Sequence, residues 1–238
     1  MVAQQPPRNL RIEEIREAGA PWFRQVFDLY EQEFQQGERE TLESIGQWLR
    51  RKNGGQLQPN DFHLLAAVDS EAETLAGFAS FHYLAEIQSG FLGYLAVCPH
   101  RRNQGIGSFL FGEVKRVIAA NAARVGPGPP LGIFMELRKE DRNNSVGAQR
   151  RRFWCRLGAR PLNFDWRYPR LQAEAGPSEM DLAFCPMRGK ETFSEQEMAQ
   201  CVRAIYRCVY QKNEDDQDLA LVLASIRGKG VIAREVSP

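Results

Sequence analysis

The spacing of apolar residues divides the start of the chain into one strand and two helices. Residues 10–14 predict a short first strand. Apolar side chains then recur at the i, i+3, i+4, i+7 positions of an amphipathic helix, namely Phe23, Val26, Phe27, Tyr30 and Phe34. A second helix is expected from about residue 40 to 51, because Asn53-Gly54-Gly55 provides a stop signal.

Three apolar runs follow, and each predicts a strand. The runs at 62–68 and 75–84 are joined by a polar turn at 69–73. The run at 91–97 is almost entirely apolar, which favours a central position in a sheet. A helix begins near Gly107 with Leu110, Val114, Val117 and Ile118 on one face. The Gly- and Pro-rich segment 126–130 ends it.

The second half continues with a strand at 131–137, a basic helix at 145–157, and strands near 160–164 and 180–186. This order of elements indicates a mixed α/β fold with a central apolar pair of strands. Ser194 and Glu197 form a capping box before a helical apolar stripe, and a shorter helix is expected at 218–226. We expect this helix pair to pack back onto the domain rather than to form a dimer contact, and the tail from Gly228 onward to be mobile.

Composition narrows the function. The chain has 238 residues, of which 43% are hydrophobic, enough for one domain with extensions or two small ones. A net charge of +1 argues against a nucleic-acid partner, and no apolar run has membrane-spanning length. Five dispersed cysteines are typical of a reduced, cytoplasmic protein. The three histidines lack metal-ligand spacing, so no metal is expected.

The segment from Val97 to Leu110 carries the clearest chemistry. A strand leads into a basic turn, then into Gly105-x-Gly107 and a helix. Glycines allow close backbone approach, and the N-terminus of a helix favours an anion such as a phosphate. The dinucleotide fingerprint is excluded because Leu110 stands where it requires Gly or Ala, and no Gly-Lys-Ser/Thr of a Walker loop follows.

Arg102-Asn103-Gln104-Gly105-Ile106-Gly107, together with Leu95-Ala96-Val97, resembles the acetyl-CoA signature of the GNAT acyltransferase superfamily. The resemblance implies an α/β GNAT fold: a mixed, mostly antiparallel central sheet with splayed middle strands, flanked by helices. It implies a GNAT domain over 1–188, with 189–238 as a helical extension. Acetyl-CoA, or another acyl-CoA, would be the co-substrate, and no metal would be needed.

The resemblance also assigns the residues that contact CoA. The backbone of Leu95, Ala96 and Val97 would hold the pantetheine arm and polarise the thioester carbonyl. Asn144 is a candidate contact to the same arm. The pyrophosphate would be held by a run of backbone amides, namely those of Arg102, Asn103, Gln104, Gly105, Ile106, Gly107 and Ser108. Arg150-Arg151-Arg152 either contributes to the phosphates or is a solvated helix face.

A second match concerns catalysis. The strand around Glu136 and the helix end Phe153-Trp154-x-x-Leu157-Gly158 resemble those of N-terminal acetyltransferases in the superfamily. In these relatives the Glu acts as base and a Tyr protonates the CoA sulfur. The resemblance therefore implies that Glu136 is the base, although it could instead pair with a nearby Arg. Trp154 occupies the Tyr position, and an indole N–H is no acid, so either Tyr168 or Tyr94 supplies a hydroxyl or no acid is needed.

These residues predict an N-acyltransferase that uses direct attack by a primary amine in a ternary complex. The acceptor would be a small molecule or a peptide, with the loop 164–179 covering it and Glu31, Glu33 or Glu86 attracting a cation. The alternative is a non-catalytic acyl-CoA-binding sensor or interaction module, which Trp154 favours. The sequence leaves open whether the protein is a monomer or a homodimer.

Overall fold

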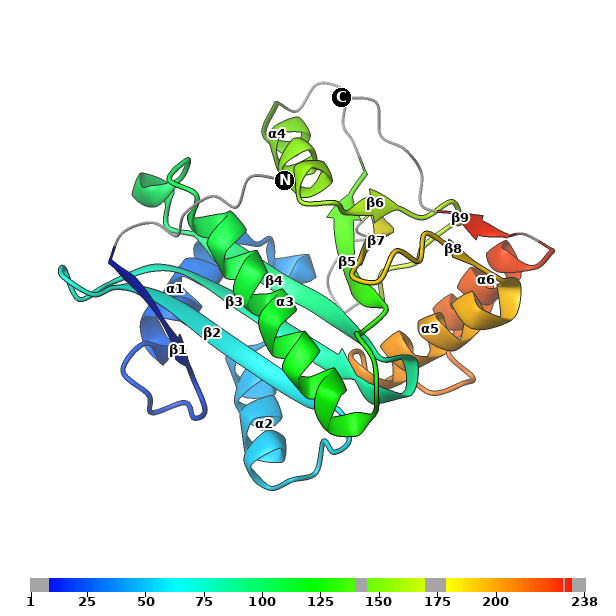
Figure 1. Cartoon of the computed structure of the whole chain (residues 1–238), viewed down its shortest axis with the longest axis horizontal. Helices are drawn as coiled ribbons and strands as arrows, with labels where there is room; N and C mark the ends of the chain where they lie inside the picture. Colours follow the sequence, from blue (N-terminus) through cyan, green and yellow to red (C-terminus); the bar gives the residue numbers. More distant parts are fainter. Residues whose placement is uncertain (1–8, 140–144, 170–178, 229, 233–238) are drawn as a thin grey trace.

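The computed structural model describes residues 9–139, 145–169, 179–228 and 230–232. Within them, seven strands form one sheet in the order β1-β2-β3-β4-β5-β7-β6 (Figure 1). Their bounds are β1 Leu10–Glu14, β2 Asp61–Asp69, β3 Thr74–Leu84, β4 Ser89–Val97, β5 Gly132–Arg138, β6 Arg160–Pro161 and β7 Met180–Pro186. Neighbouring strands are antiparallel except β4 and β5, which are parallel. The predicted mixed, mostly antiparallel sheet is confirmed.

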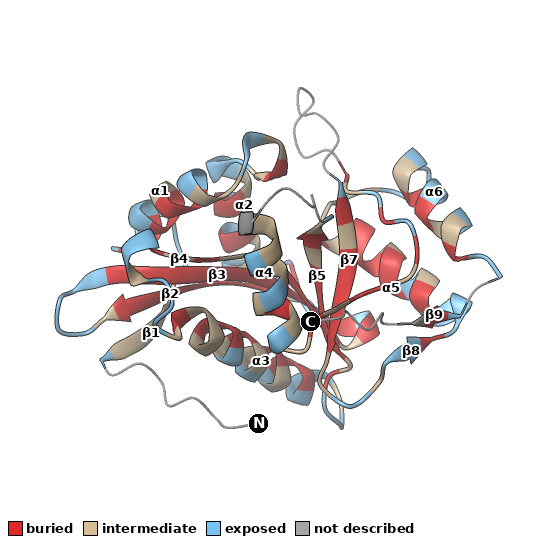
Figure 2. Cartoon of the chain, turned by 90° about the horizontal axis from the view of Figure 1, so that it is seen from above, coloured by how far each residue is buried: buried red, intermediate tan, exposed pale blue. Residues whose placement is uncertain are grey.

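Helices cover both faces of the sheet because side chains alternate along β2 and β3 (Figure 2). Leu65 and Phe81 pack against α3 (Ile106–Val125) on one face. Leu64 and Phe78 pack against α1 (Phe23–Glu33) and α2 (Leu42–Asn53) on the other. No described helix is both long and apolar enough to cross a membrane.

The C-terminal half adds α4 (Ser145–Arg156), α5 (Glu195–Cys208) and α6 (Gln217–Ile226). The apolar stripe of α5, including Met198 and Val202, shares one buried cluster with Phe134 of β5 and Phe184 of β7. The helix pair therefore extends the core beyond β7, and α5 reaches the region where β4 and β5 meet.

Two local expectations were wrong. The strand expected at 160–164 ends at Pro161 as β6. The tail after Gly228 is not loose in its described part, because Val231–Ile232 (β9) pairs with Thr192–Phe193 (β8). Val231 is buried. The burial of this apolar side chain offsets the conformational entropy that the glycine-containing tail loses when it becomes ordered.

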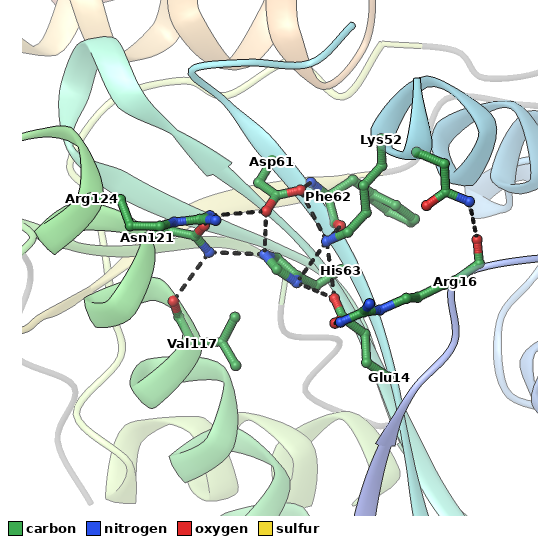
Figure 3. Close-up of polar contacts among 10 residues, drawn as sticks. Glu14, Arg16, Lys52, Asp61, Phe62, His63, Val117, Asn121 and Arg124 are labelled. Carbon is green, nitrogen blue, oxygen red and sulfur yellow. Dashed lines mark hydrogen bonds and ion pairs between the residues drawn. The ribbon is translucent and has the colours of Figure 1, made fainter. Parts of the chain in front are cut away.

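A polar network joins the two helical layers at one end of β2 (Figure 3). The His63 Nδ1 lies 2.6 Å from the Glu14 Oε1 of β1, and its Nε2 lies 3.2 Å from the Asp61 Oδ2. Lys52 of α2 contacts both carboxylates at 3.0 Å. From the opposite layer, Asn121 of α3 lies 2.8 Å from the His63 Nε2. The network therefore fixes α2 and α3 relative to the sheet.

Both carboxylates of this network are held in the ionised form. Burial opposes ionisation of Glu14, but hydrogen bonds from His63 and Lys52 outweigh it and lower the pKa to about 2. The pKa of Asp61 is also lowered, since the same two partners overcome its burial. Since an ionised carboxylate only accepts hydrogen bonds, the His63 Nδ1 must donate to Glu14.

We expect the stability of this protein to fall at acidic pH through this network. The pKa of Glu14 is lower in the folded than in the unfolded state, so its contribution is present above about pH 4.5 and is lost as the pH falls toward 2. Glu14→Gln should reduce the free energy of unfolding at pH 6 by on the order of 2 kcal/mol. It should also flatten the decline between pH 5 and pH 3, as measured by urea denaturation.

Glu13→Gln provides the control, because Glu13 is on the same strand and pairs with Arg11 near the surface. It should change the free energy of unfolding by less than about 1 kcal/mol. An equal effect of the two substitutions would show that the network does not contribute to stability in this way.

Candidate active site

The site begins where β4 and β5 separate. Their parallel pairing covers only Gly90–Leu92 with Ile133–Met135. Directly after this point, Gly93 is an extra residue in β4, since Ser80 pairs with Tyr94 and Phe81 with Leu92. Such a bulge bends a strand and breaks its ladder. Beyond it, β5 turns away from β4 (Figure 1), and the backbone of residues 93–97 has a strand partner only on the β3 side.

A cavity of about 800 Å³ occupies this opening, a volume typical of small-molecule and cofactor sites. Both separating strands line it, including the predicted pantetheine-binding residues Leu95, Ala96 and Val97. Backbone N–H and C=O groups of an unpaired strand edge need partners. The opening therefore suits a ligand that hydrogen-bonds to peptide groups along an extended arm.

The N-terminus of α3 forms the donor end of this cavity. Asn103 and Gly105 have φ angles of 63° and 80°, and alternation with left-handed residues turns successive N–H groups toward one point. Phe109 is the first residue of the helix whose N–H bonds back, to the Gly105 carbonyl at 3.0 Å, so the preceding amides are available to an anion. The cavity-lining residues of this turn are Arg102, Asn103, Gly105, Ile106, Gly107 and Ser108.

Gln104 is the one predicted residue of the turn that does not line the cavity. Its side-chain amide instead donates to the His100 carbonyl at 3.5 Å. Gly107 allows close packing, because a Cβ there would lie 3.0 Å from the Phe153 Cζ of α4 and would force that ring to shift. The two glycines thus have different roles: Gly105 sets the turn, and Gly107 admits α4.

The basic residues around the cavity form two sets: arginines near the α3 turn that pair with carboxylates, and arginines of α4. Arg101 pairs with Asp69 at 2.9 Å, and Arg102 pairs with Glu33. Arg150 and Arg152 of α4 also line the cavity, as one reading of the triple-arginine segment expected. They place positive charge opposite the α3 turn, which favours phosphates.

Trp154 packs in the core and also lines the cavity. It is 8% exposed, and its ring meets Phe111 edge-on at 5.4 Å and Phe153 at 4.9 Å. Such edge-to-face pairs stabilise aromatic clusters. The residue therefore fixes α4 against α3.

Glu136 is the buried carboxyl at the other end of the opening, on β5 immediately after the last pair with β4. Burial raises its pKa to about 7, and this rise is limited by the nearby Tyr210 hydroxyl and by the Trp166 indole N–H. The Trp166 Nε1 donates to the Glu136 Oε1 at 2.6 Å. A carboxyl with a pKa near neutrality, in a cavity, is suited to accept and release protons.

Tyr94 and Tyr168 meet beside Glu136. Their hydroxyls donate to the same carbonyl oxygen, that of Glu38, at 2.8 and 3.2 Å. Burial raises the pKa of both tyrosines above its ordinary value, so both keep their protons at neutral pH. Both line the cavity.

The acidic residues of the cavity differ from those expected. Glu31 and Glu86 do not line it, and they pair with Arg39 and Arg207. Glu33 does line it but is engaged by Arg102. Glu38 and Glu40, from the loop between α1 and α2, line it instead. Both are adjacent in sequence to Arg39. The alternating Glu-Arg-Glu sequence did not indicate which of these side chains point into the cavity.

Tyr210 is a further site residue that the sequence did not indicate. It follows α5, its ring lies 6.0 Å from that of Tyr168, and its hydroxyl is buried. That hydroxyl lies close enough to Glu136 to lower the pKa of the carboxyl, yet among the described residues it makes no hydrogen bond of standard geometry. Asn144, and residues 170–178 of the loop expected over the acceptor, lie outside the described residues.

The chain is similar in sequence to one protein family and similar in fold to several solved structures. Residues 23–125 match the family model described as the acetyltransferase (GNAT) family. No curated protein matches the chain in sequence. A GNAT-family protein of Bacteroides thetaiotaomicron has a similar structure, with a TM-score of 0.63 and 16% identity over 85% of this chain and 99% of that one.

Two other solved structures are similar in fold. NAA60 of Arabidopsis thaliana in complex with acetyl-CoA has a TM-score of 0.51 and 17% identity, covering 76% of this chain and 99% of that one. Spermidine N-acetyltransferase of Vibrio cholerae in complex with CoA and spermine has a TM-score of 0.50 and 8% identity, covering 74% and 94%. The matched segment, the mixed sheet and the open pair of central strands all agree with the resemblance seen in the sequence: residues 23–125 match the GNAT acetyltransferase family, and the fold is that of solved GNAT acetyltransferases.

Proposed function

We propose that this protein transfers an acyl group, most simply acetyl, from acyl-CoA to a primary amine of a small molecule or peptide. The observation that carries the proposal is the placement of Glu136: a carboxyl with a pKa of about 7 stands at the point where β4 and β5 open. At the other end of the same cavity is the anion-binding turn of α3. The unpaired edge of β4 runs between the phosphate site at α3 and the base at Glu136. A CoA thioester needs this arrangement, because its pantetheine arm separates the pyrophosphate from the reacting carbonyl.

The donor would bind mainly through backbone groups. The first-turn amides of α3, around Gly105 and Gly107, would hold the pyrophosphate. The free edge of β4 at Leu95–Val97 would bind the pantetheine arm, and an N–H directed at the thioester oxygen would stabilise the tetrahedral intermediate. No metal is required, because the leaving group is a thiolate.

Glu136 would act as the base. An amine is protonated at neutral pH and must lose a proton before its nitrogen can attack the thioester carbon. The ionised Glu136 accepts this proton, directly or through a water, the new C–N bond forms, and the C–S bond breaks to release CoA thiolate. A carboxyl with an ordinary pKa would be a weaker base for this step.

Tyr94 and Tyr168 would act as hydrogen-bond donors. A thiol has a pKa of about 8.5, whereas burial raises the pKa of both tyrosines above 10. Full transfer of a phenolic proton to the thiolate would therefore be unfavourable. A hydrogen bond from Tyr168 would still stabilise the developing negative charge on sulfur without moving the proton.

The first test addresses donor binding. Gly105→Asp puts a carboxylate beside the pyrophosphate, and we expect the Kd for CoA in isothermal titration calorimetry to rise at least about 10-fold. Gly105→Asn has the same shape and tolerates a positive φ angle without the charge, so it should lose less affinity. Gly112→Asp, on the exposed side of α3, should bind CoA normally. Undiminished affinity of Gly105→Asp would refute the assigned phosphate site.

The second test addresses the base. With acetyl-CoA and a panel of amines, thiol release should rise with pH through an apparent pKa near 7, because Glu136 is active when ionised. Glu136→Gln should lower kcat by about 10²-fold or more and abolish this pH dependence while leaving CoA affinity unchanged. Tight CoA binding by the wild type with no thiol release for any amine would instead support a non-catalytic acyl-CoA sensor.

The third test concerns Tyr210 as a positioning residue for Glu136. Its hydroxyl lowers the pKa of Glu136, so Tyr210→Phe should move the rising limb of the kcat/KM profile to higher pH. Tyr83→Phe removes another buried hydroxyl that has no partner among the described residues and lies outside the cavity. Tyr210 would not be a positioning residue for Glu136 if the rising limb of the kcat/KM profile stays in place in Tyr210→Phe. The same conclusion would follow if the limb moves equally in Tyr83→Phe.

A further inference from the structure

Two buried polar side chains of the cavity have no role in the proposed chemistry. Ser80 and His82 lie on the same face of β3, are 4% and 5% exposed, and line the cavity. Neither side chain has a hydrogen-bond partner among the described residues. Neither side chain has a polar atom among those that are fully enclosed without a partner, so these atoms are open to the cavity. A ligand group in the cavity would supply the missing hydrogen-bond partner.

Glu40 reaches the same part of the cavity from the loop between α1 and α2. Its Oε2 accepts hydrogen bonds from the Ser44 hydroxyl at 2.6 Å and the Trp48 indole at 2.9 Å. Its Oε1 has no partner among the described residues. The Trp48 ring also packs edge-on against His82 at 4.8 Å, so one side chain links the carboxylate to the imidazole.

The charge of this recess is not balanced by the protein. Burial raises the pKa of Glu40, and no cation is among the groups that offset this. Arg138 is engaged by Glu38. Arg51 stacks on Trp48 at 4.9 Å but does not line the cavity. A bound cation would therefore balance the negative charge of ionised Glu40 and favour the ionised form.

The hydrogen-bonding capacity of the recess also suits a cation. Burial lowers the pKa of His82 to about 3, so its imidazole is neutral and offers a lone pair. Together with the Ser80 hydroxyl and the Glu40 Oε1, the recess has three acceptors, and a primary ammonium has three donors and no acceptor. Ionised Glu40 disfavours an anion in the recess itself, whereas the arginines that line the cavity, among them Arg150 and Arg152, favour one near the α3 turn.

The distance to the reaction centre is short. Ser80 pairs with Tyr94 of β4, the residue that follows the bulge, and the acyl group is proposed to lie on the far side of β4 at this level. With strands about 4.8 Å apart, one and a half spacings place the recess about 7 Å from the attacked carbon. A short alkyl chain spans this distance.

We propose that Ser80, His82 and Glu40 form a subsite for a second ammonium group of the acceptor, which makes a short α,ω-diamine the preferred acceptor. This inference rests on the proposed N-acyl transfer for the orientation of the diamine. The subsite itself is defined by binding and can be measured without turnover.

The experiment compares three ligands with the same four-carbon chain on the CoA-bound protein by isothermal titration calorimetry: 1,4-diaminobutane, 4-amino-1-butanol and butylamine. We expect the diamine to bind at least about 10-fold more tightly than butylamine, with the amino alcohol closer to butylamine. Glu40→Gln keeps an oxygen for Ser44 and Trp48 but removes the charge, and it should reduce the preference about 10-fold. Ser80→Ala, a smaller change, should reduce it about 3-fold.

Glu43→Gln is the matched control, since it removes an exposed carboxylate three residues further along, in the first turn of α2, and should leave the preference unchanged. Equal affinities for diamine and butylamine, or tighter binding of the amino alcohol, would overturn the subsite. Acetylation of the same amines is measured separately. A preference in binding without any acetylation would overturn the proposed function alone, whereas acetylation of all three amines without a binding preference would overturn the subsite alone.

Discussion

The backbone of β4 beyond Leu92 has a hydrogen-bonding partner on one side only, and the remainder of the site is arranged around this unpaired edge. Gly93 supplies the bulge at which β4 leaves β5. The same strand continues into the turn that presents the first amides of α3. Since peptide groups at the edge of an opened sheet must find partners, the fold provides one continuous surface for an extended ligand with an anionic end.

The C-terminal helix pair changes what this opening can do chemically. Glu136 would face solvent if β5 were uncovered on that side, and its pKa would be that of an ordinary carboxyl. Trp166 and Tyr210, both outside residues 23–125, lie against it instead. Tyr206 of α5 holds this cover in place through a hydrogen bond to the Arg167 carbonyl and a ring contact with Trp166 at 5.5 Å. Burial raises the pKa of Glu136, and the hydrogen-bonding groups of Tyr210 and Trp166 limit the rise to about 7.

The sequence predicted those features that local pattern determines. The α3 turn, the central strands and the position of Glu136 follow from periodicity, glycine placement and the resemblance to one superfamily. The acceptor side could not be predicted in the same way. Trp48 contacts both Glu40 and His82, and this depends on how α2 lies over β3. Tyr210 reaches Glu136 only because α5 packs beside β5, a contact between residues far apart in sequence.

The replacement of the usual tyrosine by Trp154 is compatible with transfer on thermodynamic grounds. A thiolate is a weaker base than a buried phenolate, so a tyrosine need not give up its proton for CoA to leave. The more demanding step is removal of a proton from the ammonium, and that step depends on the environment of Glu136. With Trp154 committed to packing against Phe111, α4 secures the donor side. The hydroxyls of Tyr94 and Tyr168 gather on the opposite side, at the Glu38 carbonyl. Packing and the proposed proton transfer are therefore separated between the two sides of the opening, and the absence of a hydroxyl from α4 would leave the proposed transfer to Glu136 unchanged.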